Sequence, residues 1–487
     1  MKYLKKIGVI FIVVFTIVIV ANKEQKTQAQ IPTVEKPNVL IIFIDDLRPE
    51  LNCFGKSHIK SPNIDALANN SMVFTNAYAS VPVCGASRAS ILTGLHPTYT
   101  RFVDYGARVD EDAPNSVTMP EHFKNNGYYT CSIGKIFHHP DDALEGWSEM
   151  PCRPDYPNTL KQQELWRDYQ SEENEYTKKT NLPLGAAGPA WESANVSDDA
   201  YYDGKTAAIA VEKINLLAKS NKPFLLGVGF IRPHLPFNAP KKYWDMYNEE
   251  EIDLAENDFF PLDAPVEAKH NYGELRSYTN ISNDTIPIPA SQAKKLRHGY
   301  YASVSYVDAQ IGEIIRTLKE NNLYDNTIVL LSGDHGWNLG EHALWCKQSC
   351  FTNALITPLI VKKVNETKGR RTTSLISMLD IYPTLCELTN VKEPEHLDGN
   401  SFAEILNSPN HIINKYVYAR FHNAETIKSK QFSYTQYLDS EGRFISDMLY
   451  DNLSDPQENI NLAHKKEFKT IVEDLKSTLN KHINIRG

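Results

Sequence analysis

Two acidic pairs are the first residues in this sequence whose types and positions suggest chemistry. Asp45 and Asp46 directly follow one continuous apolar run, and Asp334 and His335 follow another much later in the chain. Ligands of open α/β sheets gather at the carboxyl ends of the strands, so the two pairs can meet. Three carboxylates gathered there would suit a hard divalent cation. Either pair alone would more simply be a helix cap or a turn, but two pairs after two apolar runs favour a metal site.

Cys84 and Arg88 are candidates for a reacting group and its partner. They lie in the segment Cys-Gly-Ala-Ser-Arg, which we expect to begin a helix. The N-terminus of a helix offers free backbone N–H groups and the positive end of the helix dipole, which suit a nucleophile that attacks an anionic ester. Arg88 follows four residues later and therefore lies on the same helical face. A buried cysteine beside a surface arginine would be the favoured interpretation without the flanking pattern.

Four further side chains could neutralise an anionic substrate. Lys135 and His138 follow one predicted strand, His234 lies in the turn Arg-Pro-His-Leu-Pro after another, and Lys347 follows Trp-Cys. A single lysine or histidine is usually structural or solvated. Here each lies past a predicted strand end, as the acidic pairs do. Together they could neutralise an oxyanion, protonate a leaving alkoxide and take a proton from an intermediate.

The elements that must position these residues alternate between strand and helix. Apolar, β-branched runs predict strands buried on both faces, typical of a parallel sheet, at 39–44, 128–133, 224–229 and 327–331. Helical patterns occur from Pro62, with Ser61 as the cap, and at 119–126, 198–220 and 292–321. This alternation predicts an α/β fold with a large mixed, mainly parallel sheet between helices.

Two polar stretches interrupt the alternation, and the pattern changes near the end of the chain. Residues 147–194 and 238–289 predict long loops or insertions, which in compact folds are usually functional or mobile. Alternating segments after residue 408, followed by a helical tail, predict a small C-terminal α+β subdomain. We therefore expect a signal peptide at 1–30, a catalytic domain at 31–407 and a smaller subdomain at 408–487.

The N-terminus has the pattern of an export signal. Three lysines precede the apolar run 7–21, which is short for a membrane span, and a polar stretch follows it. Cleavage could fall after Ala21 or near Ala29, and an uncleaved anchor is the alternative. We expect a periplasmic or secreted protein with no stable membrane span after cleavage.

Composition limits the partners of the chain. There are 51 Lys and Arg residues against 60 Asp and Glu residues, a formal charge of −9, so no nucleic-acid partner is indicated. A polyanionic substrate would have to be met by local cations. The seven cysteines are an odd number for an exported chain, and conversion of Cys84 would leave an even number. A Cys346–Cys350 pair and buried free thiols both remain open.

Taken together, the motifs resemble the type I, formylglycine-dependent sulfatases, and more closely their iduronate-2-sulfatase branch. The similarity runs from about Pro37 to at least Pro358 and continues near the C-terminus. One match could be chance, but this many in order is a strong signal. The matching stretches are Asp45 to Leu51, Cys84 to Gly94 with Arg101, Tyr128 to His138, Arg232 to Phe237, Tyr301 to Tyr306, Gly333 to His342 and Leu449 to Pro456.

The resemblance implies an alkaline-phosphatase-like fold, a bound Ca²⁺ and a maturation enzyme that converts Cys84 to formylglycine, whose hydrate attacks sulfur. Arg88 would stabilise that residue. The calcium would be held, together with residue 84, by Asp45, Asp46, Asp334 and His335.

The same resemblance gives roles to the remaining candidates. Lys135, His234 and Lys347 would contact the sulfate, and His234 or Lys347 would protonate the leaving group. His138 would act as a base on the formylglycine hydrate, so that sulfate is expelled and the aldehyde returns.

The expected function is an exported sulfatase that acts on a sulfated oligo- or polysaccharide. We expect a 2-O-sulfate of a uronic acid or similar sugar, in a glycosaminoglycan or an algal polysaccharide such as ulvan. Ala86, Leu95 and Gly333 depart from the usual motifs, and Gly333 replaces a serine of the iduronate branch. The alternatives are a phosphatase or phosphonate hydrolase of the same superfamily, and an inactive carbohydrate-binding relative.

Overall fold

The structure is a computed structural model that describes residues 36–154, 167–180, 188–281 and 287–486. The expected signal peptide at 1–30 lies outside the described residues. Within the described ranges, no helix combines the length and the apolar character needed to cross a membrane.

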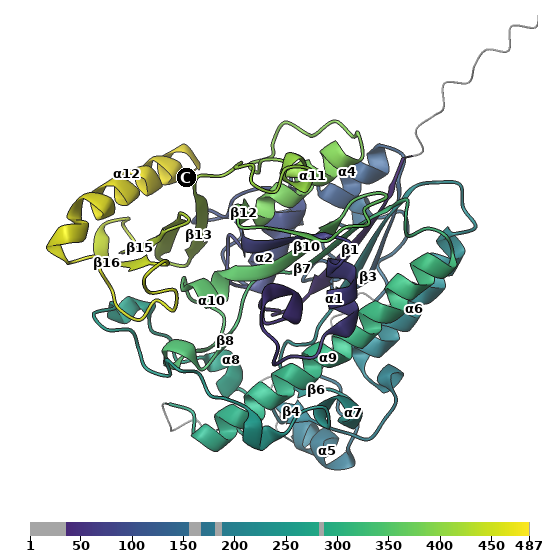
Figure 1. The fold of residues 1–487 in the computed structure, drawn as a ribbon, viewed down its shortest axis with the longest axis horizontal. Helices are drawn as coiled ribbons and strands as arrows, with labels where there is room; N and C mark the ends of the chain where they lie inside the picture. Colours follow the sequence, from purple (N-terminus) through teal and green to yellow (C-terminus); the bar gives the residue numbers. More distant parts are fainter. Residues whose placement is uncertain (1–35, 155–166, 181–187, 282–286, 487) are drawn as a thin grey trace, which may run out of the picture. The chain divides into compact units, whose positions relative to one another are not determined.

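A mainly parallel sheet forms the centre of the fold (Figure 1). It has eight strands. The strand order is β11-β2-β10-β7-β1-β5-β3, with β12 beside β2, and only β10 runs against its two neighbours. This confirms the predicted mixed, mainly parallel sheet. The strands are β1 (Asn38–Ile44), β2 (Met72–Tyr78), β3 (Tyr129–Gly134), β5 (Phe224–Phe230), β7 (Thr327–Gly333), β10 (Ile356–Lys362), β11 (Arg370–Thr372) and β12 (Ile376–Ser377).

Helices cover both faces of this sheet because alternate side chains of each strand point to opposite faces. In β1, Leu40, Ile42 and Ile44 belong to one buried cluster. Val39, Ile41 and Phe43 belong to another. The first cluster includes residues of α1 (Pro62–Ala68), α6 (Tyr202–Leu217) and α9 (Ala290–Glu320). The second includes residues of α2 (Cys84–Thr93), α4 (Met119–Asn125) and α11 (Ile381–Leu388). Strands covered on both faces explain the continuous apolar runs in the sequence.

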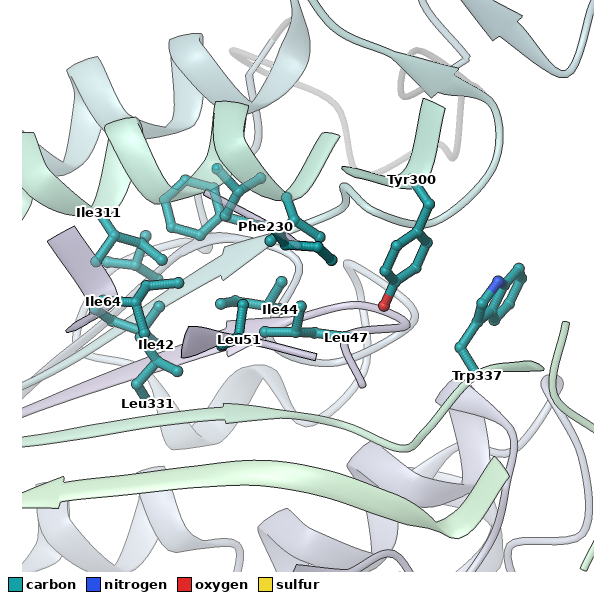
Figure 2. Packing of buried hydrophobic residues seen from close by; sticks show 14 of the residues in the cluster. Ile42, Ile44, Leu47, Leu51, Ile64, Phe230, Tyr300, Ile311, Leu331 and Trp337 are labelled. Carbon is teal, nitrogen blue, oxygen red and sulfur yellow. The ribbon is translucent and has the colours of Figure 1, made fainter. Parts of the chain in front are cut away.

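The long helix α9 fixes the chain where it leaves β1. Figure 2 shows Ile311 of this helix near Ile42 and Ile64, and the Tyr300 hydroxyl directed toward the loop after β1. The Tyr300 hydroxyl donates to the carbonyl of Asp46 at 2.9 Å and accepts from the backbone N–H of Arg48 at 3.0 Å. The apolar core therefore anchors the backbone of a candidate site residue.

The two polar stretches contain short ordered elements rather than unbroken loop. The first holds α5 (Glu172–Thr180) and β4 (Trp191–Glu192). The second begins at the last residue of β6 (Phe237–Asn238) and holds α7 (Lys241–Trp244) and α8 (Gly273–Arg276). The helix predicted at 198–220 begins as a 3-10 turn, Asp198–Ala200, and continues as α6. Other short elements are α3 (Val109–Asp112), β8 (Asn338–Leu339), β9 (Trp345–Cys346) and α10 (Thr352–Leu355).

A second, antiparallel sheet forms a smaller C-terminal unit. Its strands are β13 (Val417–Phe421), β14 (Ala424–Lys428), β15 (Phe432–Leu438) and β16 (Phe444–Asp451), in that order. Helix α12 (Lys469–Arg486) packs on it through Leu475 and Leu479, which meet Ile427, Tyr434 and Leu449. This confirms the predicted α+β subdomain, although β14 was missed. Its boundary at residue 408 stays a prediction.

Candidate active site

The two acidic pairs converge at the carboxyl edge of the central sheet. Strands β1 and β7 pair with Ile44 opposite Gly333, so Asp45 and Asp334 leave the sheet side by side. The backbone N–H of Asp46 donates to the Asp334 carboxylate at 3.2 Å. Asp46 has a φ of 61°, a left-handed conformation that is costly for a non-glycine residue and recurs at functional sites. All three carboxylates are fully buried.

The chain after β1 passes so close to β7 that Gly333 has no room for a side chain. A Cβ atom on Gly333 would lie 2.5 Å from both the carbonyl oxygen of Leu47 and the hydroxyl of Thr357. The serine that the resemblance leads us to expect at this position would clash unless the backbone moved. Residue 333 therefore offers no side-chain contact to a substrate here.

Cys84 is the first residue of α2, and its thiol faces the acidic pairs. Its sulfur lies within 4.8 Å of ligand atoms of Asp45, Asp334 and His335. The preceding Val83 is extended, so the thiol sits at the N-terminus of a helix, where free N–H groups favour negative charge. Burial by itself would raise the pKa of this thiol. Lys135 and other cations outweigh burial and hold the pKa well below its ordinary value.

Arg88 lies between the carboxylates rather than at the surface. Its Nε donates to Asp334 at 2.8 Å, and its Nη2 lies 3.5 Å from Asp45. Nη1 donates to the carbonyls of Lys135 and Ile136. The side chain is fully buried. The guanidinium therefore compensates two buried negative charges, which removes the interpretation of a surface arginine.

Lys135 reaches the same cluster from the end of β3, where the backbones of β3 and β5 lie close together. Gly134 ends β3 with a φ of +70°, and a side chain on it would collide with the carbonyl of Gly229 in β5. From there the Lys135 ammonium pairs with Asp45. His138 interacts with Cys84, while its buried Nδ1 has no hydrogen-bond partner among the described residues. Burial lowers the pKa of His138, which favours the neutral imidazole.

His234 and Lys347 approach the cluster from loops. The Lys347 ammonium donates to both oxygens of Asp46, at 2.9 and 3.1 Å, and lies 4.9 Å from the centre of the Trp337 ring. His234 Nε2 lies 3.8 Å from Asp46. Burial raises the pKa of Asp46 to about 7, although both cations act in the opposite direction. All the residues predicted from the sequence thus meet in one buried group.

Glu274 also belongs to this group and was missed in the sequence. It lies on α8, inside the polar stretch 238–289, and no motif marks it. Its Oε1 lies 3.0 Å from Nε2 of His234 and 3.1 Å from the Lys347 ammonium. Although burial opposes the effect, these two cations hold the pKa of Glu274 below its ordinary range. The available signal was only the presence of an insertion that follows the turn containing His234.

The strand-end residues fit a divalent cation. Asp45, Cys84, Asp334 and His335 offer ligand atoms that all lie within 4.8 Å of one another. Among the described residues, Oδ1 of Asp45 and Nε2 of His335 are buried without a hydrogen-bond partner. Nδ1 of His335 lies 2.9 Å from the carbonyl of Gly336, an acceptor, so Nε2 is free to face a cation. Asp46 borders this group, 3.5 Å from His335.

The cysteines other than Cys84 play no part in this cluster. All seven cysteines are free thiols, and Cys346 and Cys350 are both buried. The structure therefore agrees with buried free thiols and contains no Cys346–Cys350 pair.

Comparison with known proteins agrees with the fold. The sulfatase family model matches residues 37–391, and that of the N-sulphoglucosamine sulphohydrolase C-terminal region matches residues 340–484. Among solved structures, a phosphonate monoester hydrolase from Silicibacter pomeroyi aligns with a TM-score of 0.73 and 20% identity over 93% of this chain and 96% of that one. A 2-O GAG sulfatase aligns with a TM-score of 0.68 and 20% identity over 93% of each chain. These likenesses confirm the expected alkaline-phosphatase-like fold.

A sequence relative narrows the assignment further. Iduronate 2-sulfatase from Homo sapiens is 34% identical over 417 residues, which are 77% of this chain and 73% of that protein. The family match covers most of the chain, including the strand ends that carry the acidic pairs and Cys84. The chain therefore belongs to the sulfatase family and is a sulfuric ester hydrolase.

Proposed function

We propose that this chain is an exported sulfatase that removes a sulfate ester from a carbohydrate through a formylglycine at position 84. The observation that carries the proposal is the single buried group in which a thiol at a helix N-terminus meets three carboxylates and several cations. Such a group stabilises an anionic nucleophile and can also neutralise an anionic ester.

A maturation enzyme would convert Cys84 to formylglycine. The hydrated aldehyde supplies one hydroxyl that attacks sulfur and displaces the sugar alkoxide, and a second whose deprotonation expels sulfate and restores the aldehyde. His138 is the proposed base for that deprotonation. Its lowered pKa and its interaction with residue 84 support this role.

Asp45, Asp46, Asp334 and His335, together with residue 84, would hold Ca²⁺. The bound cation would supply positive charge that polarises the sulfate group. Arg88 keeps Asp45 and Asp334 in place by pairing with both of them. Buried carboxylates without such compensation would lose their charge instead.

Lys135, Lys347 and His234 would bind the sulfate oxygens. His234 is the proposed acid for the leaving alkoxide, because both of its ring nitrogens face acceptors. Nδ1 lies 2.6 Å from the carbonyl of Leu235, and Nε2 lies 3.0 Å from Glu274. A histidine between two acceptors carries a proton on each nitrogen.

The proposed substrate carries a 2-O-sulfate on a uronic acid or similar sugar, within a glycosaminoglycan or an algal polysaccharide such as ulvan. The identity with human iduronate 2-sulfatase supports this position of the sulfate. The N-terminal pattern of three lysines before an apolar run supports export to the periplasm or outside the cell.

Co-expression with a formylglycine-generating enzyme tests this function. Mass spectrometry of the peptide that contains residue 84 should show the aldehyde in place of the thiol. The matured protein should then release sulfate from 2-O-sulfated oligosaccharides, and chelation of divalent cations should stop the release. Active native protein with an unmodified thiol would overturn the mechanism. Failure on every 2-O-sulfated sugar, with release from other positions, would overturn the specificity.

A further inference from the structure

Glu274 is an unexpected residue in a site that must accept an anion. Its carboxylate contacts His234 and Lys347, which are two of the three proposed sulfate-binding side chains. Among the described residues, it is the carboxylate that contacts both of them without belonging to the proposed calcium site. An ester that takes these two donors meets a negative charge already bound to them.

The position of Glu274 is set by the fold rather than by a flexible side chain. Tyr272 precedes α8 in a left-handed conformation with a φ of 44°. The Arg276 guanidinium lies 4.4 Å from the centre of the Tyr272 ring and donates to its hydroxyl at 2.7 Å. Helix α8 also packs against β9, the strand directly before Lys347. The backbone therefore holds the carboxylate of Glu274 close to its two cations.

We propose that Glu274 is a charge-selecting residue, which makes the site favour singly charged sulfate esters over doubly charged phosphate monoesters. This inference rests on the proposed function, because it assigns the sulfate to His234 and Lys347. Near neutral pH a sulfate monoester carries one negative charge and a phosphate monoester carries two.

The selection follows from Coulomb's law. An ester oxygen that accepts from His234 and Lys347 must share these donors with the carboxylate of Glu274 or displace it. When the donors are shared, the repulsion between the carboxylate and the ester grows in proportion to the charge of the ester. At a separation of about 6 Å and an effective dielectric constant of about 20, with screening by salt at physiological ionic strength, one unit of charge changes affinity about tenfold. The affinity of the dianion is therefore lowered by this factor twice, and that of the monoanion once.

The sharpest test compares two anions that share a tetrahedral sulfate group and differ by one charge. Methyl sulfate is a monoanion and inorganic sulfate is a dianion. Titration calorimetry in the Cys84→Ala background, with Ca²⁺ present, measures binding without turnover or maturation. Adding Glu274→Gln should raise affinity for both anions, and about tenfold more for inorganic sulfate. An equal gain for both anions, or no gain, would overturn the inference.

Two control variants separate charge selection from a change in packing. Glu274→Asp keeps the charge and should keep the preference of the parent protein. Glu267→Gln removes a carboxylate from the same polar stretch, where it accepts from the Ser446 hydroxyl at 2.9 Å, and should change neither affinity. Thermal unfolding of each variant shows whether the fold is intact. A changed preference in Glu267→Gln would mean that net charge alone is responsible, and would overturn the assignment to Glu274.

A turnover assay distinguishes failure of this inference from failure of the proposed function. Matured enzyme is assayed with 4-nitrophenyl sulfate and 4-nitrophenyl phosphate. Glu274→Gln should raise the ratio of phosphate to sulfate kcat/KM about tenfold. No hydrolysis of any sulfate ester by matured wild-type protein would sink the proposed function, while the calorimetric comparison would still decide the role of Glu274.

Discussion

The two halves of the site are built in different ways. The strand-end half consists of Asp45, Cys84, Arg88, Asp334 and His335, and the loop half consists of His234, Glu274 and Lys347. The strand-end residues follow β1 and β7 or open α2, and their side chains are almost completely buried. In the loop half, Lys347 follows the short strand β9 and Glu274 lies in the short helix α8, and Glu274 keeps 19% of its side chain exposed. The first half is thus buried within the fold, whereas the second holds two of the three side chains proposed to bind the sulfate.

Backbone conformation shows the same contrast. In the loop half, Cys346 and Gln348 flank Lys347 with φ values of 67° and 63°. Left-handed residues on both sides of a lysine cost energy, which the surrounding fold must supply. In the strand-end half, Asp45 and Asp334 are placed by ordinary strand register, and the left-handed residue is Asp46, which follows Asp45. Changes in the strand-end half should therefore affect stability and activity, and changes in the loop half mainly activity.

The largest effect is expected from Cys84→Ala in the strand-end half. Loss of the proposed nucleophile should reduce kcat by about 10⁴-fold or more. Sulfate release from a 2-O-sulfated oligosaccharide measures it. Cys152→Ala, which changes a half-buried thiol outside the cluster, should retain activity. If Cys84→Ala were as active as the wild-type protein, the strand-end half would have no role in the chemistry.

Arg88→Ala should be the most destabilising single change. It leaves Asp45 and Asp334 buried without their cationic partner, which typically costs about 3–5 kcal/mol of unfolding free energy. Denaturant unfolding in the presence of a chelator measures the loss. Arg316→Ala, which removes exposed ion pairs on α9, is the control and should cost less than about 1 kcal/mol. Equal costs would mean that the strand-end half is not structural.

Lys347→Met should separate activity from stability. Removing one donor to the sulfate should lower kcat/KM by about 10²–10³-fold. The loss of unfolding free energy should be smaller than in Arg88→Ala, because Glu274 can regain water and Asp46 can take up a proton. Burial already raises the pKa of Asp46 to about 7, and loss of the Lys347 charge would raise it further. Steady-state kinetics and denaturant unfolding of the same preparation provide both numbers. A destabilisation as large as that of Arg88→Ala would erase the distinction between the halves.

Tyr300→Phe should give the smallest effect, on the support of the strand-end half. The change removes the hydrogen bonds to the Asp46 carbonyl and the Arg48 N–H, at a cost of about 1–2 kcal/mol. The Ca²⁺ concentration for half-maximal activity should rise severalfold, while KM at saturating Ca²⁺ stays close to wild type. Tyr324→Phe, which alters a tyrosine whose hydroxyl has no hydrogen-bond partner among the described residues, should leave the Ca²⁺ requirement unchanged.

Local sequence patterns were enough to predict most of the strand-end half. A run of apolar, β-branched residues predicts a buried strand, and the first polar residue after it lies at the sheet edge, so Asp45 and Asp334 could be found locally. Cys84 and Arg88 could be found because their motif spans one helical turn. The small C-terminal subdomain was also predicted, although β14 lies in a short segment without a clear alternating pattern.

The loop half and the space around it depend on how distant segments pack against each other. Glu274 meets Lys347 because α8 packs on β9, a contact between segments that carry no shared periodicity. The lack of room at Gly333 depends on how the chain after β1 crosses β7 and on Thr357 of β10. Local patterns report which face of an element is buried. They do not report which distant side chain will share a cation, because that depends on the packing of the whole fold.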